Sequence, residues 1–246
     1  MEEPSGSYFT AIERDPEQLR IALSTGMWGR ANPPDPEIAE RVGAVAKLLE
    51  GLGHHVEEIA DQSICNWQAL WSAYCVNWVG SRAQFATMAK DRGVAPERLH
   101  EYLGPMVHRH YLAAERYDKF DIWKMMVCNN TVTREFGRLM ERFDALLVPT
   151  MAIRVPAANG PYSLLRDEEL DCWLERLCDA CRYTMPANET GLPGISVPAG
   201  LDVDGLPIGI QLYGNFCRKD LLLKLAAQIE RARPEQFGAV PPVHVS

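Results

Sequence analysis

One serine stands in a pattern that is close to the surroundings of a catalytic nucleophile. Ser196 lies in the segment Gly194-Ile195-Ser196-Val197-Pro198, a near match to the G-x-S-x-G pattern of serine hydrolases. Two aspartates and a histidine follow it in the order of a catalytic triad: Asp202, Asp204 and His244. However, a proline replaces the second glycine, which permits the sharp turn at such a serine, and Ser196 falls inside a predicted strand. The pattern therefore argues against Ser196 as a nucleophile.

The histidines and cysteines offer no stronger centre. His108 and His110 would point to different faces of a helix, and His54 and His55 to opposite sides of a strand, so neither pair can share a metal ion. We expect these histidines to be solvated or to cap backbone groups. Cysteine catalysis needs a neighbour that stabilises a thiolate, and the sequence shows none beside Cys65, Cys75, Cys128 or Cys217. We expect no metal site, no cofactor and no catalytic residue in the chain.

Composition excludes several classes of partner. The 246 residues include 25 Lys and Arg against 33 Asp and Glu, a net charge of −8, which argues against nucleic acid or an anionic membrane as the main partner. The seven cysteines are odd in number, and Cys172, Cys178 and Cys181 fall on a predicted helix, where reduced thiols are expected. This cysteine usage favours a reducing, cytoplasmic compartment. The composition leaves open whether the chain forms a homo-oligomer.

The strongest local structural signal runs from Asn188 to Gly214. Residues 195–197 and 208–212 are predicted to form short strands, and Asp204-Gly205 between them predicts a tight hairpin. Two interpretations remain open from the pattern alone. The segment is either a structural hairpin at a sheet edge or a rigid backbone that lines a functional site.

A strand–helix–strand unit is predicted near the N-terminus. Residues 19–24 have the pattern of a buried strand, Asp35-Pro36-Glu37 opens a helix that Gly53 ends, and residues 55–59 form a second strand. Such a unit joins parallel strands of an α/β sheet. We expect a lead-in over residues 1–18, a single α/β domain over 19–233 and a tail over 234–246.

The middle of the chain, from Asp61 to Phe143, is predicted to be almost wholly helical. Asp61-Gln62-Ser63 is expected to cap a helix that carries four aromatic residues on one face, with Cys75 beside them: Trp67, Trp71, Tyr74 and Trp78. Such a stripe forms either plain core or an aromatic wall beside an apolar substrate. A later helix, from about Asp121 to Arg142, has apolar residues at core spacing: Ile122, Met125, Met126, Val132, Phe136, Leu139 and Met140.

Three blocks of the sequence resemble the C-terminal region of amidase signature enzymes. They are FDALLVPT at 143–150, NETGLPGISVPAG at 188–200 and DGLPIGIQL at 204–212, in that order. The resemblance covers nearly the whole chain, but only about the C-terminal half of a typical family member. It implies an α/β fold in which helices flank a mixed sheet, an α/β/α sandwich. It also implies hydrolysis of a carbon–nitrogen amide bond in a small molecule.

In that family a lysine, a cis-peptide serine and a nucleophilic serine perform the chemistry, and a Gly/Ser-rich loop binds the oxyanion. This sequence has no such loop, and its six lysines fall mostly on predicted helices, away from paired serines. We therefore carry over no catalytic residue and expect a C-terminal part of an amidase that is inactive alone. The missing N-terminal half or a partner subunit is the implied partner.

The resemblance also suggests which residues face the substrate, a small-molecule amide. The candidate pocket residues come from the aromatic helix and from the approach to the hairpin: Trp71, Cys75, Trp78, Asn188, Thr190 and Gly191. An apolar aryl or alkyl amide would suit such a pocket better than a charged one. The alternatives are a non-catalytic α/β binding module and a subunit of an amidotransferase-type complex.

Overall fold

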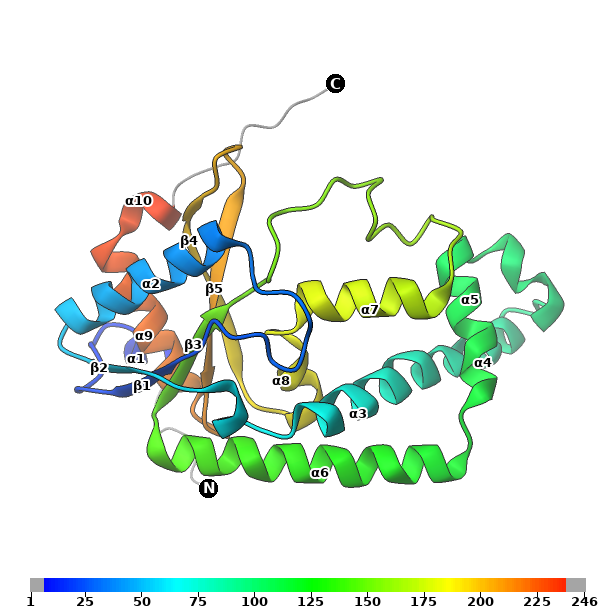
Figure 1. Cartoon of the computed structure of the whole chain (residues 1–246), viewed down its shortest axis with the longest axis horizontal. Helices are drawn as coiled ribbons and strands as arrows, with labels where there is room; N and C mark the ends of the chain where they lie inside the picture. Colours follow the sequence, from blue (N-terminus) through cyan, green and yellow to red (C-terminus); the bar gives the residue numbers. More distant parts are fainter. Residues whose placement is uncertain (1–6, 238–246) are drawn as a thin grey trace.

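A five-stranded mixed sheet lies at the centre of the part of the chain that the structure, a computed structural model, describes: residues 7–237 (Figure 1). The strand order is β2-β1-β3-β5-β4. The first three strands in this order are parallel, β5 is antiparallel to β3, and β4 is antiparallel to β5. The strands are β1 (Arg20–Leu23), β2 (His55–Glu58), β3 (Ala145–Pro149), β4 (Gly194–Leu201) and β5 (Pro207–Gly214). The predicted mixed α/β sheet is thus confirmed.

The predicted strand–helix–strand unit forms from local signals. Helix α2 (Pro36–Gly51) begins after Asp35, whose carboxylate accepts a hydrogen bond from the Glu37 amide at 2.9 Å. Gly53 follows the helix with a φ of +98°, in the left-handed region that favours glycine. The chain then enters β2, which pairs in parallel with β1. The crossover is therefore the one that the sequence predicts.

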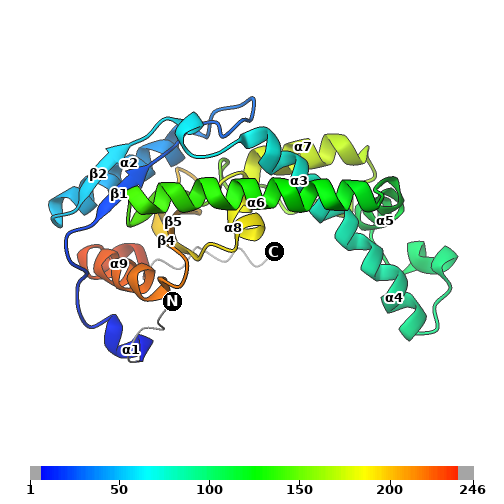
Figure 2. The same ribbon diagram turned by 90° about the horizontal axis from the view of Figure 1, so that it is seen from below.

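Helices cover both faces of the sheet (Figures 1 and 2). On one face, α2 and α9 (Lys219–Ala232) pack with a core that includes Ile21, Leu147 and Ile210. On the other face the covering helices are α3 (Trp67–Gly80), α6 (Lys119–Arg142) and α8 (Met185–Thr190). The α/β/α layering expected from the resemblance is present.

Three further helices extend this second layer away from the sheet. They are α4 (Gln84–Asp91), α5 (Pro105–Ala113) and α7 (Leu170–Cys181), and Figure 2 shows α4 and α5 at the end farthest from β1 and β2. A small core of its own holds the region together: Val79, Met106, Leu170, Trp173 and Leu174. Within residues 7–237, no helix has the length and apolar character needed to cross a bilayer.

Short elements and chain ends complete the description. Short 3₁₀ helices lie at Asp61–Ser63, Ser81–Ala83, Pro96–Glu101 and Ala114–Arg116. Part of the predicted lead-in forms α1 (Tyr8–Ala11), and the start of the predicted tail forms α10 (Pro234–Phe237). His244, the last residue of the triad-like pattern, lies outside the described residues.

Two sequence predictions about the second layer are wrong. Asp61–Ser63 does not cap α3, because Asn66 is its N-cap and accepts a hydrogen bond from the Ala69 amide at 3.1 Å. Ile122 and Met126 are 40% and 61% exposed, although their spacing predicts core. The reason is that periodicity finds an apolar face but does not show whether another element covers it.

For His110, the structure excludes one of the two predicted alternatives and supports the other, contact with a backbone group. His110 is 1% exposed, so it is not solvated. Its Nδ1 bonds the Met106 carbonyl at 2.8 Å, and Trp78 Nε1 donates to its Nε2 at 3.2 Å. A carbonyl one helical turn back and an indole from α3 thus satisfy both ring nitrogens, which allows burial.

The central strand provides a test of the core. Leu147 in β3 is fully buried, so Leu147→Ala leaves a cavity and should lower the free energy of unfolding by about 2–5 kcal/mol. Leu165 is 72% exposed, and Leu165→Ala should change it by less than about 0.5 kcal/mol. Urea denaturation of both variants measures the difference. Equal effects of the two substitutions would contradict this packing.

Candidate functional site

A pair of hydroxyl groups meets on the sheet where β3 ends. Thr150, directly after β3, and Ser196, in β4, have their Oγ1 and Oγ atoms 2.6 Å apart. Strand β5 runs between β3 and β4. The Thr150 amide donates to the Gly209 carbonyl of β5 at 3.0 Å, and Gly209 pairs with Pro198, two residues along β4 from Ser196. A Cβ atom on Gly209 would lie 2.8 Å from Thr150 Oγ1 and 3.1 Å from Ser196 Oγ. The missing side chain therefore allows the two hydroxyls to meet across the intervening strand.

The hydroxyl pair lines a cleft of about 410 Å³ at the carboxyl end of β3. The rest of the lining comes mainly from the loop 151–156 and the β4–β5 hairpin and is mostly apolar, with Met151, Ile153 and Ile208 among its residues. Such an apolar cleft with few polar groups is typical of small-molecule sites.

The charge in this cleft is already neutralised. Arg154 contributes the guanidinium group, which lies 2.9 Å from Asp204 and 3.4 Å from Asp35. The polar groups offered to a ligand are therefore chiefly the hydroxyls. Two hydroxyls can donate and accept hydrogen bonds, but a hydroxyl is too weak a base to activate Ser196, which agrees with the argument from sequence. Within residues 7–237, no three His, Cys, Asp or Glu side chains could hold a metal ion together.

The aromatic residues of α3 pack in the core between the sheet and its second layer of helices. Trp71 is 8% exposed, its Nε1 donates to the Trp28 carbonyl at 2.9 Å, and the Arg30 guanidinium lies 5.2 Å from its ring centre. Trp78 is half-buried and stacks on Tyr74 with ring centres 5.8 Å apart. The stripe thus packs as core for much of its length, and only its less buried members are accessible.

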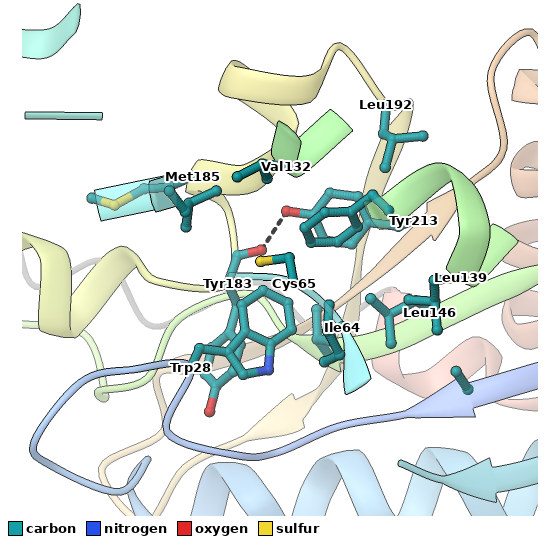
Figure 3. Packing of buried hydrophobic residues seen from close by; sticks show 14 of the residues in the cluster. Trp28, Ile64, Cys65, Val132, Leu139, Leu146, Tyr183, Met185, Leu192 and Tyr213 are labelled. Carbon is teal, nitrogen blue, oxygen red and sulfur yellow. Dashed lines mark hydrogen bonds between the residues drawn. The ribbon is translucent and has the colours of Figure 1, made fainter. Parts of the chain in front are cut away.

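Sequence reasoning missed Trp28, which organises this core. It is fully buried, stacks on Trp67 with ring centres 4.8 Å apart, and meets the Tyr183 ring edge-on at 5.0 Å. Figure 3 shows Trp28 beside Tyr183, whose carbonyl accepts a 2.5 Å hydrogen bond from the Tyr213 hydroxyl. The loop around Trp28 is rich in Gly, Asn and Pro, so no periodicity indicates a buried residue there.

The three predicted pocket residues before the hairpin have different roles. The Thr190 hydroxyl donates to the Pro186 carbonyl at 2.6 Å, and Gly191 ends α8 with a φ of +73°. Asn188 is exposed on α8. None of the six predicted pocket residues lines the 410 Å³ cleft. That they contact a substrate stays a prediction.

A buried carboxyl group links helices α8 and α3 in the same layer. Glu189 of α8 is 8% exposed, and its Oε1 accepts a hydrogen bond from Asn77 Nδ2 of α3 at 3.2 Å. Burial raises the pKa of Glu189, and hydrogen bonds from Asn77 and from Asn129 of α6 offset only part of this effect. The charged form is therefore costly in the folded chain.

This burial predicts a dependence of stability on pH. A carboxyl whose folded-state pKa is raised binds more protons in the folded than in the unfolded chain, so its contribution to stability is lost as pH rises through that pKa. Glu189→Gln removes the titration. The urea midpoint of Glu189→Gln should therefore rise relative to that of the parent chain as pH increases from about 4 to about 8.

The exposed Glu115 provides the matched control for this measurement. Glu115→Gln should change stability little, since the carboxyl lies in solvent in both states. A difference between Glu189→Gln and the parent that stays constant with pH would contradict the account.

The hydroxyl pair predicts a coupling between strands. Gly209→Ala should lower the free energy of unfolding by about 1–3 kcal/mol, because the new Cβ meets both hydroxyls. The loss should be smaller in a Thr150→Ala background, which removes the nearer of these atoms. Urea denaturation of the parent, of each single variant and of the double variant gives the coupling energy. Additive effects of the two substitutions would exclude the contact.

Comparisons with known proteins place the chain in a family. Residues 1–223 match the model of the amidase family. A glutamyl-tRNA(Gln) amidotransferase subunit of Lactococcus lactis subsp. lactis (strain IL1403) is 30% identical over 91% of this chain and 46% of its own length. The putative amidase AmiC of Mycobacterium bovis (strain ATCC BAA-935 / AF2122/97) is 31% identical over 89% of this chain and 44% of its own length.

A solved structure agrees with these matches. A bacterial aryl acylamidase of the amidase signature family superposes with a TM-score of 0.77 at 27% identity, over 97% of this chain and 49% of that protein. The chain spans about half the length of the curated relatives that it matches. The match to the family model over most of the sequence and the superposition of the fold lead to one conclusion: the chain belongs to the amidase family.

Proposed function

We propose that this chain forms the substrate-facing part of an enzyme that hydrolyses the carbon–nitrogen amide bond of a small molecule. The observation that carries the proposal is the match to the amidase family over residues 1–223. The cleft at the end of β3 adds support, because its volume of about 410 Å³ falls within the range of small-molecule sites. In this enzyme, residues 19–233 would form one α/β domain.

The lining of the cleft suggests the class of amide. Apolar side chains such as Ile153 and Ile208 favour an aryl or alkyl group, and the Thr150 and Ser196 hydroxyls can bond an amide carbonyl or N–H. Arg154 is paired with Asp35 and Asp204, so it offers little to a carboxylate substrate. On this proposal the substrate is an uncharged amide. Asn188 and Gly191, which are exposed, and Trp78, which is half-buried, would meet a part of it that extends beyond the cleft.

The catalytic lysine and serines would come from outside these 246 residues, as a preceding segment or a partner subunit. Two observations support this. Among the described residues, the hydrogen-bond partner of the Ser196 hydroxyl is another hydroxyl and not a base. The relatives are also about twice as long as the region that they share with this chain.

The free cysteines support a cytoplasmic location, where thiols stay reduced.

A second candidate is a subunit that acts only within an amidotransferase-type complex. The relative from Lactococcus lactis, which is named as such a subunit, favours this candidate. The two candidates differ in what restores activity. A hydrolase needs its complementary segment alone, whereas a member of an amidotransferase complex needs the other subunits together with an acceptor.

The proposal predicts that the purified chain alone releases no amine from aryl or alkyl amides above the uncatalysed rate, because no activated nucleophile is present. Mixing it with a separately produced segment of the aryl acylamidase, the part outside the shared region, should yield hydrolysis that needs both components. Released arylamine, measured by absorbance, reports the rate. Hydrolysis by the chain alone, above all hydrolysis that Ser196→Ala abolishes, would contradict the proposal.

A further inference from the structure

Two arginines of α6 line a second cleft, whose volume is about 530 Å³. Arg138 and Arg142 are four residues apart, so their side chains are neighbours on one face of the helix. The other wall is residues 62–66, where the chain passes from β2 into α3, and Figure 1 shows this segment beside α6. The cleft shares no residue with the one at the end of β3. It is therefore a separate candidate site.

The two guanidinium groups are available to a ligand. Both side chains are exposed, and within residues 7–237 neither forms an ion pair with a carboxylate. The guanidinium carbon of Arg142 lies 5.2 Å from the centre of the Phe143 ring, a contact that orients the side chain. Many other arginines of this acidic chain are paired with carboxylates, among them Arg30, Arg98, Arg109, Arg116, Arg154 and Arg176.

The cleft has a net positive charge. Its carboxylate, Glu135, is already engaged, because its Oε2 accepts a hydrogen bond from the Asn66 amide at 2.7 Å. The lining residues therefore carry two positive charges and one negative charge, a net charge of +1. Exposed Gln62 and Ser63 add uncharged polar groups, and buried Ile64 adds an apolar surface. These groups suit an anion that is attached to an uncharged polar body.

We propose that this cleft binds the phosphate group of a phosphorylated small molecule. A guanidinium group presents its N–H donors in a planar fork that matches phosphate, and two such groups one helical turn apart can share three terminal oxygens. A carboxylate has two oxygens and one charge, so a single guanidinium group would satisfy it. The volume of about 530 Å³ leaves room for the organic part of the ligand. The proposal does not depend on amide hydrolysis.

A neighbouring arginine provides the matched control. Arg134, one turn before Arg138, is also exposed and forms no ion pair among the described residues. It lines a different cleft, of about 500 Å³, together with Glu141. Arg138 borders both clefts, whereas Arg142 borders the 530 Å³ cleft and not the other. Substitutions of Arg142 and Arg134 therefore remove the same charge from the same helix but from different clefts.

Isothermal titration calorimetry of the 246-residue chain with inorganic phosphate tests the proposal. Phosphate should bind at one site per chain, glucose 6-phosphate should compete with it, and glucose should not. Arg138→Gln and Arg142→Gln should each weaken phosphate binding by about tenfold or more, since each removes charge-assisted hydrogen bonds. Arg134→Gln should change the affinity by less than about twofold. Acetate should bind more weakly than phosphate.

A substitution of Glu135 should have the opposite effect. In Glu135→Gln the amide oxygen can still accept the hydrogen bond from Asn66, but the charge that repels an anion is gone, so phosphate should bind more tightly. Circular dichroism checks that each variant is folded.

Several outcomes would overturn the proposal. They are no saturable binding of phosphate below about 10 mM, equal losses in Arg134→Gln and Arg142→Gln, and no gain in Glu135→Gln. Phosphate binding without competition from glucose 6-phosphate would indicate an adventitious ion only and would also overturn it.

Discussion

The fold depends on the hydrogen bonding of β3 along both of its edges. This strand pairs in parallel with β1 and antiparallel with β5, and all five of its residues are buried. Both of its faces are therefore covered, which explains why its sequence is apolar throughout and does not alternate. The strand joins the crossover unit to the β4–β5 hairpin. Where it ends, at Pro149, the chain turns into the loop that lines the cleft.

The chemistry available at this end of the sheet follows from a residue without a side chain. Gly209 leaves room for Thr150 and Ser196 to share a hydrogen bond across β5. The cleft therefore presents two polar atoms against an apolar lining, an arrangement suited to orienting an uncharged amide. Two interpretations of the hairpin were open from sequence. The hairpin is structural, and the same strands also line the candidate site.

Local signals were enough to predict much of this fold. The crossover unit and the Asp204-Gly205 turn each depend on neighbouring residues, and both appear as expected. Features that depend on distant segments could not be predicted. The Thr150–Ser196 pair joins two strands, burial of His110 needs Trp78 from another helix, and exposure of Met126 depends on what lies opposite α6. Helix α8 is six residues long, too short for a period to be visible.

Hydrogen–deuterium exchange tests most directly the claim that the cleft faces the catalytic machinery. It would compare the chain alone with the chain bound to the complementary segment of an amidase relative. The account predicts added protection in residues 150–156 and 194–200, which line the cleft or adjoin it. Helix α2 packs on one face of the sheet and should be unchanged beyond its first turn, where Ile38 reaches the cleft. Protection along the rest of α2 with none at the hairpin would contradict the account.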